Sequence, residues 1–527
     1  MNSFLLLALA SLILGLGDGE RKVPFPADAD ARYTVARATE HVSFLASDEM
    51  RGRDTPSPEL DKAADYIAEH FRKLGLEPLA KDGFKLPYNL ITRDLDTSKA
   101  NTNLMLSIAG VATELPLKKG FVPFEQTGEG QVRNARVVFA GFGITAPEYD
   151  YDDYASIDAK GAVVVVFRGE PEHEDTARFN GKRWTRYSFA DHKKSNAEKH
   201  GALAVLILDA PRSKRSLMLN EHGWRSLTGS RRSGGLQLDE KRAGIPVIHV
   251  GDAVANAVFG SIDSLVAVVT RIDKSLVPDS REVRDADMLS VSCKVTLTKD
   301  IIPAVNVAGM LRGAKYPDEY VVMGAHYDHV GVGKANAEGD SIFNGADDNG
   351  SGTTGILLVS EALASSSTRP DRSVVFIAFS AEEKGLLGSK AYVANTPLPM
   401  KSCVAMINMD MIGRSEDGKL SIGGNQRCPD LVRINEEENA SAARPFTLAY
   451  DIEQYFFRSD QASFAMKKVP VLFYFTGEHK DYHKQTDEIA KLNMPDLVAI
   501  TRLASRVAWR AAHQPRTTYI PAGFEEE

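Results

Sequence analysis

Four apolar runs in the C-terminal half of the chain each end in a histidine or a carboxylate. The runs are YVVMGA, SVVFIAFS, CVAMINM and VPVLFYF. In the same order they are followed by His326, by Glu382 and Glu383, by Asp410 and, after a short loop, by Tyr482 and His483. A further segment, NGADDNGSG, places Asp347 and Asp348 just before a helix expected to begin near Ser351. Side chains of these types serve as metal ligands and as acid–base groups.

This set of donors predicts a pair of metal ions. Carboxylates gathered in one place repel one another and are costly to desolvate unless a cation compensates them. Histidines and carboxylates without a thiolate suit zinc. Five donors exceed the needs of one tetrahedral zinc ion, and two ions about 3.5–4 Å apart that share one carboxylate account for the surplus. Taken singly, each piece also has an ordinary structural interpretation, such as a helix cap or a turn.

The elements that must position these residues are strands alternating with helices. From residue 300 onward, near-continuous Val, Ile and Phe runs are separated by helical patterns such as TTGILLVSEALAS. This pattern is typical of a parallel sheet covered on both faces. Ligands of such sheets bind outside the carboxyl ends of the strands. We therefore predict an α/β fold with a mostly parallel central sheet flanked by helices, and the metal site at one edge of it.

The chain before residue 300 contains two regions with other sequence patterns. Residues 32–77 are expected to be helical, because their apolar residues follow a period near 3.6. Residues 100–280 hold one helix-like segment, KKSNAEKHG, among short β-type runs: ARVVFAGFGI, GAVVVVFRG, ALAVLILDA, IPVIHVGD and LVAVVTRI. We interpret residues 110–275 as an inserted β-rich domain. The main domain is then discontinuous and formed by residues 30–109 and 276–515.

Composition narrows the class of protein. The 527 residues exceed one typical core. The chain has 71 acidic and 63 basic residues and no long Lys/Arg cluster, so we expect no nucleic-acid partner. The three cysteines lack any CxxC spacing, and we expect them to be buried, inert thiols. The sequence does not indicate an oligomeric state.

The start of the chain is expected to direct export. Phe4 to Gly17 (FLLLALASLILGLG) is almost wholly apolar, but it is shorter than the about 20 residues that span a bilayer. This favours a signal peptide over residues 1–19 and a periplasmic or secreted protein. An uncleaved membrane anchor is the alternative. No stable membrane partner is expected otherwise.

The motifs HYD, GADDNGSG, SAEEKGLLGS, NMDM and DYHKQTDE, in this order over residues 326–487, resemble those of peptidase family M28, the co-catalytic zinc aminopeptidases. The segment HVSFLASDEMRGRDTPSPELDKAADYIAEHFRKLGLEPL resembles the N-terminal helices of that family. Residues 110–275 resemble the protease-associated domain inserted in many members. The resemblance implies two Zn²⁺ per chain and an exopeptidase that removes N-terminal residues from peptides.

The resemblance also implies a role for each residue of the site. Asp348 would bridge the two metals, with His326 on one and His483 on the other. Glu383 and Asp410 would be the remaining carboxylate ligands. Glu382 would be the general base that takes a proton from the water between the metals and gives it to the leaving amine. Tyr482 would stabilise the oxyanion, and a packing aromatic is the alternative.

Three neighbours of the ligands have open roles. Asp328 stands where it can accept the second N–H of His326 and fix its tautomer. Asp487 either orients His483 or caps the following helix. His329 is expected to lie behind the ligands or at the surface.

Other functions compete with an aminopeptidase. A carboxypeptidase or dipeptidase on the same metals needs a cation for the substrate carboxylate, and Arg414 and Arg458 are candidates. A non-catalytic relative would be expected to lose ligands, and a single-zinc acyl transferase would not need the second set. The departure of Ser459-Asp460-Gln461 from the Ser-Asp-His of many relatives leaves substrate preference open. Tyr455-Phe456-Phe457 lines either a side-chain pocket or the core.

Overall fold

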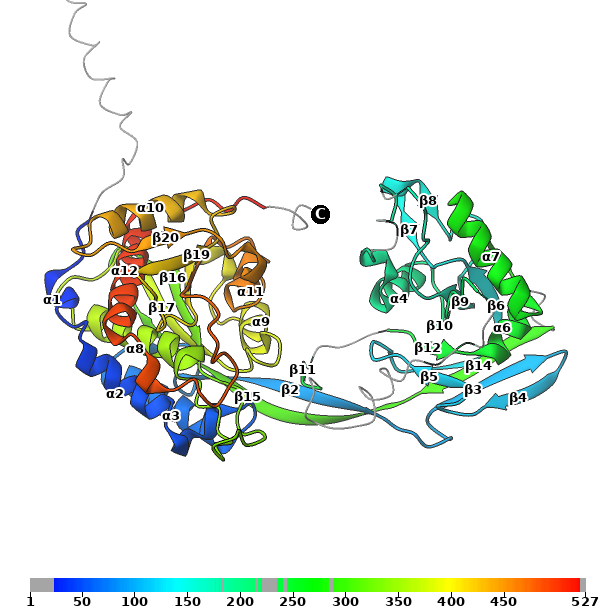
Figure 1. Ribbon diagram of the computed structural model, residues 1–527, viewed down its shortest axis with the longest axis horizontal. Helices are drawn as coiled ribbons and strands as arrows, with labels where there is room; N and C mark the ends of the chain where they lie inside the picture. Colours follow the sequence, from blue (N-terminus) through cyan, green and yellow to red (C-terminus); the bar gives the residue numbers. More distant parts are fainter. Residues whose placement is uncertain are drawn as a thin grey trace, which may run out of the picture. The chain divides into compact units, whose positions relative to one another are not determined.

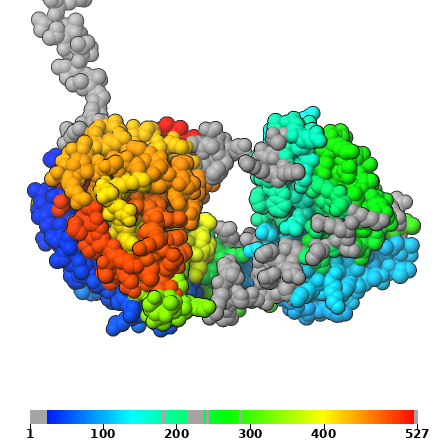
Figure 2. Space-filling model, in the orientation of Figure 1, coloured from blue at the N-terminus to red at the C-terminus, as the bar shows by residue number. Residues whose placement is uncertain are grey.

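In a computed structural model, the chain folds into two compact units. The structure describes residues 23–175, 177–179, 181, 184–213, 217, 219, 235–239, 244–283 and 288–521. The expected signal peptide, residues 1–19, lies outside these residues. The first unit comprises residues 1–90 and 302–527, and the second comprises residues 91–301 (Figure 1). Figure 2 shows the insertion as a change of colour, since the first unit combines blue with yellow-to-red residues and the second runs from light blue to green.

The boundaries between the units fall within two long strands, β2 (Lys85–Leu95) and β15 (Leu297–Leu311). The boundaries expected from the sequence, 110 and 275, lie inside the second unit. The physical reason is strand pairing: β3 (Asn103–Ile108) and β14 (Leu289–Val295) are antiparallel partners in the sheet of the second unit. Their sequences, NLMLSI and LSVSCKV, carry no compositional break that would mark a boundary.

The first unit is built on a mixed sheet whose strands follow the order β2-β15-β17-β16-β18-β21-β19-β20. The four apolar runs predicted as strands are its centre: β16 (Tyr316–His326), β17 (Arg372–Phe379), β18 (Cys403–Met409) and β21 (Val471–Phe475). They pair in parallel, and β17, β18 and β21 are buried along their whole length. The predicted α/β fold with a mostly parallel centre is confirmed. The remaining strands are β1 (Glu77–Pro78), β19 (Lys419–Gly423) and β20 (Thr447–Ala449).

Helices cover both faces of this sheet. Figure 1 shows α8 (Gly352–Ala364) and α12 (Met494–His513) on one side of the strands and α9 (Leu387–Ala394) and α11 (Gln461–Ala465) on the other. The N-terminal helices, predicted from their apolar stripes, are α2 (Val35–Leu45) and α3 (Pro58–Lys73). The hydroxyl of Ser57 caps α3 by accepting the N–H of Leu60 at 3.0 Å. Further helices are α1 (Ala27–Asp30) and α10 (Pro429–Ala440).

The second unit has its own sheet and its own apolar core. The order of its strands is β4-β3-β14-β6-β9-β10-β12-β5, and β13 pairs with β6. Four of the predicted β-type runs are strands here, and KKSNAEKHG lies in helix α4 (Ala190–Lys199). The strands not yet bounded are β4 (Val111–Leu115), β5 (Phe121–Pro123), β6 (Gly130–Ala140), β7 (Thr145–Ala146), β8 (Tyr151–Asp152), β9 (Val163–Phe167), β10 (Ala204–Leu208), β11 (Gln237–Leu238), β12 (Val247–Val250) and β13 (Ser280–Glu282).

The prediction of a strand for LVAVVTRI is wrong. These residues belong to helix α7 (Ile262–Ser275), which follows α6 (Asp252–Phe259). The Ser261 hydroxyl caps α7 by accepting the N–H of Ser264 at 3.1 Å. The buried residues are spaced as on one helix face and outweigh the strand preference of the valines: Leu265, Val268, Val269 and Ile272. Within the described part of the chain no single helix has the length and apolarity to cross a membrane; α6 and α7, bent by 75°, pass only as a pair and only by length and composition.

Candidate metal centre

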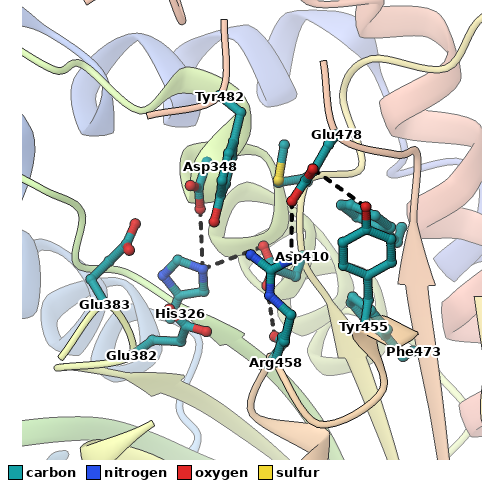
Figure 3. Close-up of a pocket in the computed structure, with 13 residues that line it drawn as sticks. His326, Asp348, Glu382, Glu383, Asp410, Tyr455, Arg458, Phe473, Glu478 and Tyr482 are labelled. Atoms are coloured by element: carbon teal, nitrogen blue, oxygen red, sulfur yellow. Dashed lines mark hydrogen bonds and ion pairs between the residues drawn. The ribbon is translucent and has the colours of Figure 1, made fainter. Parts of the chain in front are cut away.

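The structure brings all five predicted ligands together at one edge of the central sheet, and Figure 3 shows four of them: His326, Asp348, Glu383 and Asp410. Four arrive at or just after the carboxyl ends of strands, and the fifth precedes α8. His326 is the last residue of β16, and Asp410 follows β18 directly. Glu383 lies beyond the end of β17, and His483 lies in the loop that follows β21. Asp348 belongs to the turn that leads into α8.

Asp348 stands between two groups of donors. Its Oδ1 lies 3.4 Å from Nε2 of His326, which is also 3.3 Å from Oδ1 of Asp410. Its Oδ2 lies 3.1 Å from Nε2 of His483, which is also 3.1 Å from Oε2 of Glu383. The ligand atoms within each group are no more than 4.8 Å apart. One carboxylate oxygen therefore faces each group, as a shared ligand of two ions requires.

Two buried atoms of this cluster support a metal site. Oδ2 of Asp348 and Nε2 of His483 lie 3.1 Å apart, but they are not joined by a hydrogen bond, and neither atom has another hydrogen-bond partner among the described residues. Buried polar atoms are rarely left without one. The donors are histidine nitrogens and carboxylate oxygens, with no thiolate, and this set suits zinc. The residues present therefore fit a pair of zinc ions.

Electrostatic coupling within the cluster is strong. Burial alone would raise the pKa of Asp348, but the imidazoles of His329, His326 and His483 outweigh it and lower that pKa well below its usual value. Burial opposes the protonation of His483, yet Asp348 and Glu383 raise its pKa to about 10. The carboxylates thus stabilise positive charge at the place where cations would bind.

His329 belongs to the second group of donors. It is fully buried, and its Nδ1 lies 2.9 Å from Oε1 of Glu383 and 3.6 Å from Oδ2 of Asp348. The sequence left open whether this histidine lies behind the ligands or at the surface. The structure excludes the surface and places the ring against Glu383.

Glu382 lies in the same pocket as the ligands. Burial raises its pKa well above the usual value, and the carboxylates of Glu383 and Asp410 add to the rise against the opposing effect of His326. Its backbone N–H donates to Oδ1 of Asp328 at 3.1 Å. The position of Glu382 is therefore fixed from behind, while its carboxyl group is open to the pocket.

Asp328 differs from the expectation. Its carboxylate was expected to accept the second N–H of His326, but Nδ1 of that ring lies 3.1 Å from the backbone oxygen of Asp328. The carboxylate accepts the N–H of Glu382 and the hydroxyl of Thr55. The backbone turns after β16, so the carbonyl, and not the side chain, faces the ring.

Asp487 was expected either to orient His483 or to cap the following helix, but its contacts give it another role. Its Oδ2 accepts the backbone N–H groups of Asp347 at 3.0 Å and Asp348 at 3.1 Å. It thereby fixes the turn that carries the shared ligand. Ser459 supports the other group of donors, since its hydroxyl donates to Oδ2 of Asp410 at 2.6 Å.

Arg53 supports the site and was missed in the sequence. It is 1% exposed, and its guanidinium donates to the backbone oxygens of Leu45, Tyr327, Asn344 and Gly345. It thus connects the end of helix α2 with the residue that follows β16 and with the residues just before the turn that carries Asp348. The only signal in the sequence is an arginine directly after Gly52, which gives no hint of burial.

Tyr482 lines the pocket beside Asp348 (Figure 3). Its ring stacks on that of His483 at a centroid distance of 3.9 Å. Burial and the surrounding carboxylates, Asp348 first among them, raise the pKa of its hydroxyl above the usual value. The hydroxyl therefore stays protonated at neutral pH and is available as a hydrogen-bond donor.

The two candidate arginines have different surroundings. Arg414 pairs with Asp481 at 3.0 Å and does not line the pocket, whereas Arg458 does. Of Tyr455-Phe456-Phe457, Tyr455 lines the pocket and Phe456 is fully buried in the core. Gln461 lies in the core as well, where it accepts from Asn408 at 2.8 Å. Its difference from the histidine of many relatives therefore lies outside the pocket lining.

Comparisons with known proteins agree with this geometry. Residues 306–508 match the model of peptidase family M28, and residues 132–258 match the PA domain. The fold and the site thus define an α/β protein of the zinc-peptidase type. Residues 306–508 are thus similar to peptidase family M28, and the segment before them is similar to the PA domain.

Individual relatives are more distant. The chain is 25% identical over 410 residues to Aminopeptidase YwaD of Bacillus subtilis (strain 168). This alignment covers 76% of this chain and 65% of the relative. It is 36% identical over 173 residues to a probable zinc metalloprotease of Pyrenophora teres f. teres, covering 27% of this chain and 36% of the relative. An aminopeptidase structure from Aneurinibacillus sp. strain AM-1 aligns with 94% of this chain and 98% of its own at 19% identity and a TM-score of 0.46. The chain therefore spans less than two thirds of the length of these two sequence relatives.

Proposed function

We propose that this protein is a zinc-dependent aminopeptidase that removes N-terminal residues from peptides. The observation that carries the proposal is the position of Asp348, whose two oxygens face two separate groups of histidine and carboxylate donors. The names of the relatives, an aminopeptidase and a probable zinc metalloprotease, support the same activity.

The ligands in this proposal are His326 and Asp410 for one zinc ion and His483 and Glu383 for the other, with Asp348 shared. Two zinc ions bound in this way would polarise the scissile carbonyl and make water a stronger nucleophile at neutral pH. The residues of the chain supply the rest of the chemistry.

Glu382 is the general base in this proposal. A carboxyl group whose pKa is raised can take up a proton from the attacking water and give it to the leaving amine near neutral pH. Tyr482 donates its O–H to the oxygen of the tetrahedral intermediate. The carboxylates around the pocket bind the free α-amino group of the substrate, because it is positively charged.

A carboxypeptidase or dipeptidase is the second candidate function. The observation that favours it is Arg458, a cation that lines the same pocket. In that case Arg458 would bind the carboxylate of the substrate. Its ion pair with Glu478 at 3.2 Å speaks against this role, because the guanidinium already has a partner.

The test combines metal content with hydrolysis. We expect elemental mass spectrometry to find two zinc ions per chain and aminoacyl-nitroanilides to be cleaved. The variant Glu382→Gln should keep both ions and lose activity by at least about a hundredfold, the scale of general acid–base catalysis. Cleavage of peptides with a blocked N-terminus but not of those with a blocked C-terminus would favour the carboxypeptidase, and a chain without zinc would exclude both.

We also propose that the protein is exported. The apolar run from Phe4 to Gly17 supports this. Expression in a bacterial host followed by fractionation and N-terminal sequencing tests it, and we expect a product outside the cytoplasm that begins near residue 20. A product that retains the run and stays with the membrane would indicate an anchor.

A further inference from the structure

The pocket at the metal centre has two chemically different ends. One end contains four of the proposed ligands, His326, Asp348, Glu383 and Asp410, together with Glu382. The other end is formed by aromatic and apolar side chains with two charged residues among them (Figure 3): Met411, Tyr455, Arg458, Phe473, Phe475 and Glu478.

The apolar end is firmly packed. Phe473 and Phe475 are buried and stack on each other at a centroid distance of 5.4 Å, and Tyr455 packs against Phe475 at 5.5 Å. An aminopeptidase substrate has its scissile carbonyl at the metals, so the side chain of its first residue extends into the rest of the pocket. This wall offers that side chain an apolar surface.

The two charged residues of this end neutralise each other. Nη1 of Arg458 lies 3.2 Å from Oε1 of Glu478, and the hydroxyl of Tyr455 donates to Oε2 of Glu478 at 3.3 Å. The guanidinium of Arg458 also lies over the ring of Tyr455, 5.1 Å from its centroid. Figure 3 shows Glu478 joined to both residues. The aromatic end of the pocket therefore carries one positive and one negative charge, each with a partner.

We propose that the ion pair of Arg458 and Glu478 determines which N-terminal residue is cleaved. Because the two charges cancel, the pocket accepts large uncharged side chains and rejects Lys, Arg, Asp and Glu. This inference rests on the proposed aminopeptidase activity and specifies the substrate class of the same pocket.

The selection has a simple electrostatic cause. A charged substrate side chain would meet the like-charged member of the pair, and it could gain the other member only by breaking the bond between Arg458 and Glu478. Charge complementarity between a binding site and its ligand affects specificity more than overall affinity. Removing one member should therefore change the preference in a direction that depends on which member remains.

The pair can be changed without unfolding the protein. The side chains of Arg458 and Glu478 are 54% and 38% exposed, and ion pairs at such positions contribute little to stability. Lys419 and Asp451 form a pair of similar exposure, at 2.8 Å, whose residues do not line the pocket. Lys419→Met is therefore the matched control for loss of a partly exposed cation.

The experiment measures kcat/KM for leucyl-, lysyl- and glutamyl-nitroanilide. Arg458→Met leaves Glu478 unpaired and should raise the lysyl-to-leucyl ratio about tenfold, whereas Glu478→Gln leaves Arg458 unpaired and should raise the glutamyl-to-leucyl ratio about tenfold, for one charge partly screened by water. The exchanged pair, Arg458→Glu with Glu478→Arg, should restore the preference for leucine. Lys419→Met should leave every ratio within about twofold of the wild-type protein.

The outcomes separate this inference from the proposed function. If the wild-type protein cleaves leucyl-nitroanilide but the ratios do not change in either single variant, the pair does not determine specificity and the aminopeptidase proposal stands. A wild-type protein that prefers lysyl- or glutamyl-nitroanilide would also overturn the inference. If no substrate with a free amine is cleaved, the proposed function fails, and this inference fails with it. Leucine, lysine and glutamate are the amino acids released from these substrates. In each variant their affinities, measured by calorimetry, should rank in the same order as the kcat/KM values of the corresponding nitroanilides.

Discussion

The carboxylate of Asp328 accepts the backbone N–H of Glu382 at 3.1 Å. Asp328 is fully buried, and its second oxygen accepts the hydroxyl of Thr55 at 3.1 Å. Through this contact a residue that follows β16 fixes the start of the loop that follows β17. The proposed general base is thus positioned by a neighbouring strand rather than by its own.

The first prediction concerns Asp328. Asp328→Asn replaces one acceptor oxygen by an N–H₂ group, which cannot accept from both Glu382 and Thr55. We expect kcat to fall about ten- to hundredfold, the range seen when groups behind a metal site are changed, while zinc is retained. Steady-state kinetics and metal analysis check this. Asp318→Asn, at an exposed position of β16, should have no effect, and loss of zinc from the Asp328 variant would contradict the proposed role.

The second prediction concerns the division of the ligands into two groups. Asp348→Ala removes the carboxylate that both groups share and should abolish tight binding of both zinc ions. His483→Ala removes a ligand of one group only and should leave about one ion per chain, since the set around His326 stays intact. Metal analysis after dialysis measures both numbers. Equal loss in the two variants would show that the ions bind as one cooperative unit.

The third prediction concerns pH and His70. Burial and the neighbouring His41 lower the pKa of His70 to about 4. Between that value and the ordinary 6.5, the unfolded chain binds more protons than the folded one, so the free energy of unfolding falls as pH drops through this window. The loss should reach about 2–3 kcal/mol. His70→Gln removes this titration. Urea unfolding at pH 7, 6, 5 and 4.5 measures the free energy of unfolding, which should fall less steeply with decreasing pH in the variant than in the wild-type protein. An unchanged dependence on pH would refute the prediction.

The fourth prediction concerns Arg53. Its buried guanidinium donates to four backbone oxygens from three parts of the first unit. Arg53→Met leaves these oxygens without their donor and should destabilise the first unit by about 3 kcal/mol or more. Chemical unfolding measures the change. Arg51→Met, at an exposed position nearby, should change stability by less than about 0.5 kcal/mol.

Much of the fold followed from the sequence because the central strands are fully buried. Buried parallel strands read as unbroken apolar runs, and the residue that ends such a run must lie at the edge of the sheet. The apolar runs alone were therefore enough to predict that His326 and Asp410 share one site. The individual roles of the ligands and of Glu382 and Tyr482 stay predictions.

Other features depend on contacts between distant residues. The helix α7 was missed because its valines favour strands in isolation, and only its one-sided burial shows otherwise. Asp487 and Arg53 bind backbone groups, and Asp328 binds the backbone N–H of Glu382, and such groups leave no mark in the sequence. The pairing of Arg458 with Glu478 joins residues of two loops, and neither residue is distinctive by itself.

The interrupted course of the first unit has a consequence for its synthesis. The helix α2 packs against α8, and Arg53 donates to the oxygens of Asn344 and Gly345. These partners are made about 300 residues after α2, so at 5–20 residues per second the ribosome delivers them roughly 15–60 s later. During that interval the apolar faces of α2 and α3 have no sheet to cover, and the inserted unit, which ends at residue 301, is completed before α8 is made. We therefore expect the inserted unit to fold before the first unit, and the early helices are the part that a chaperone would have to shield.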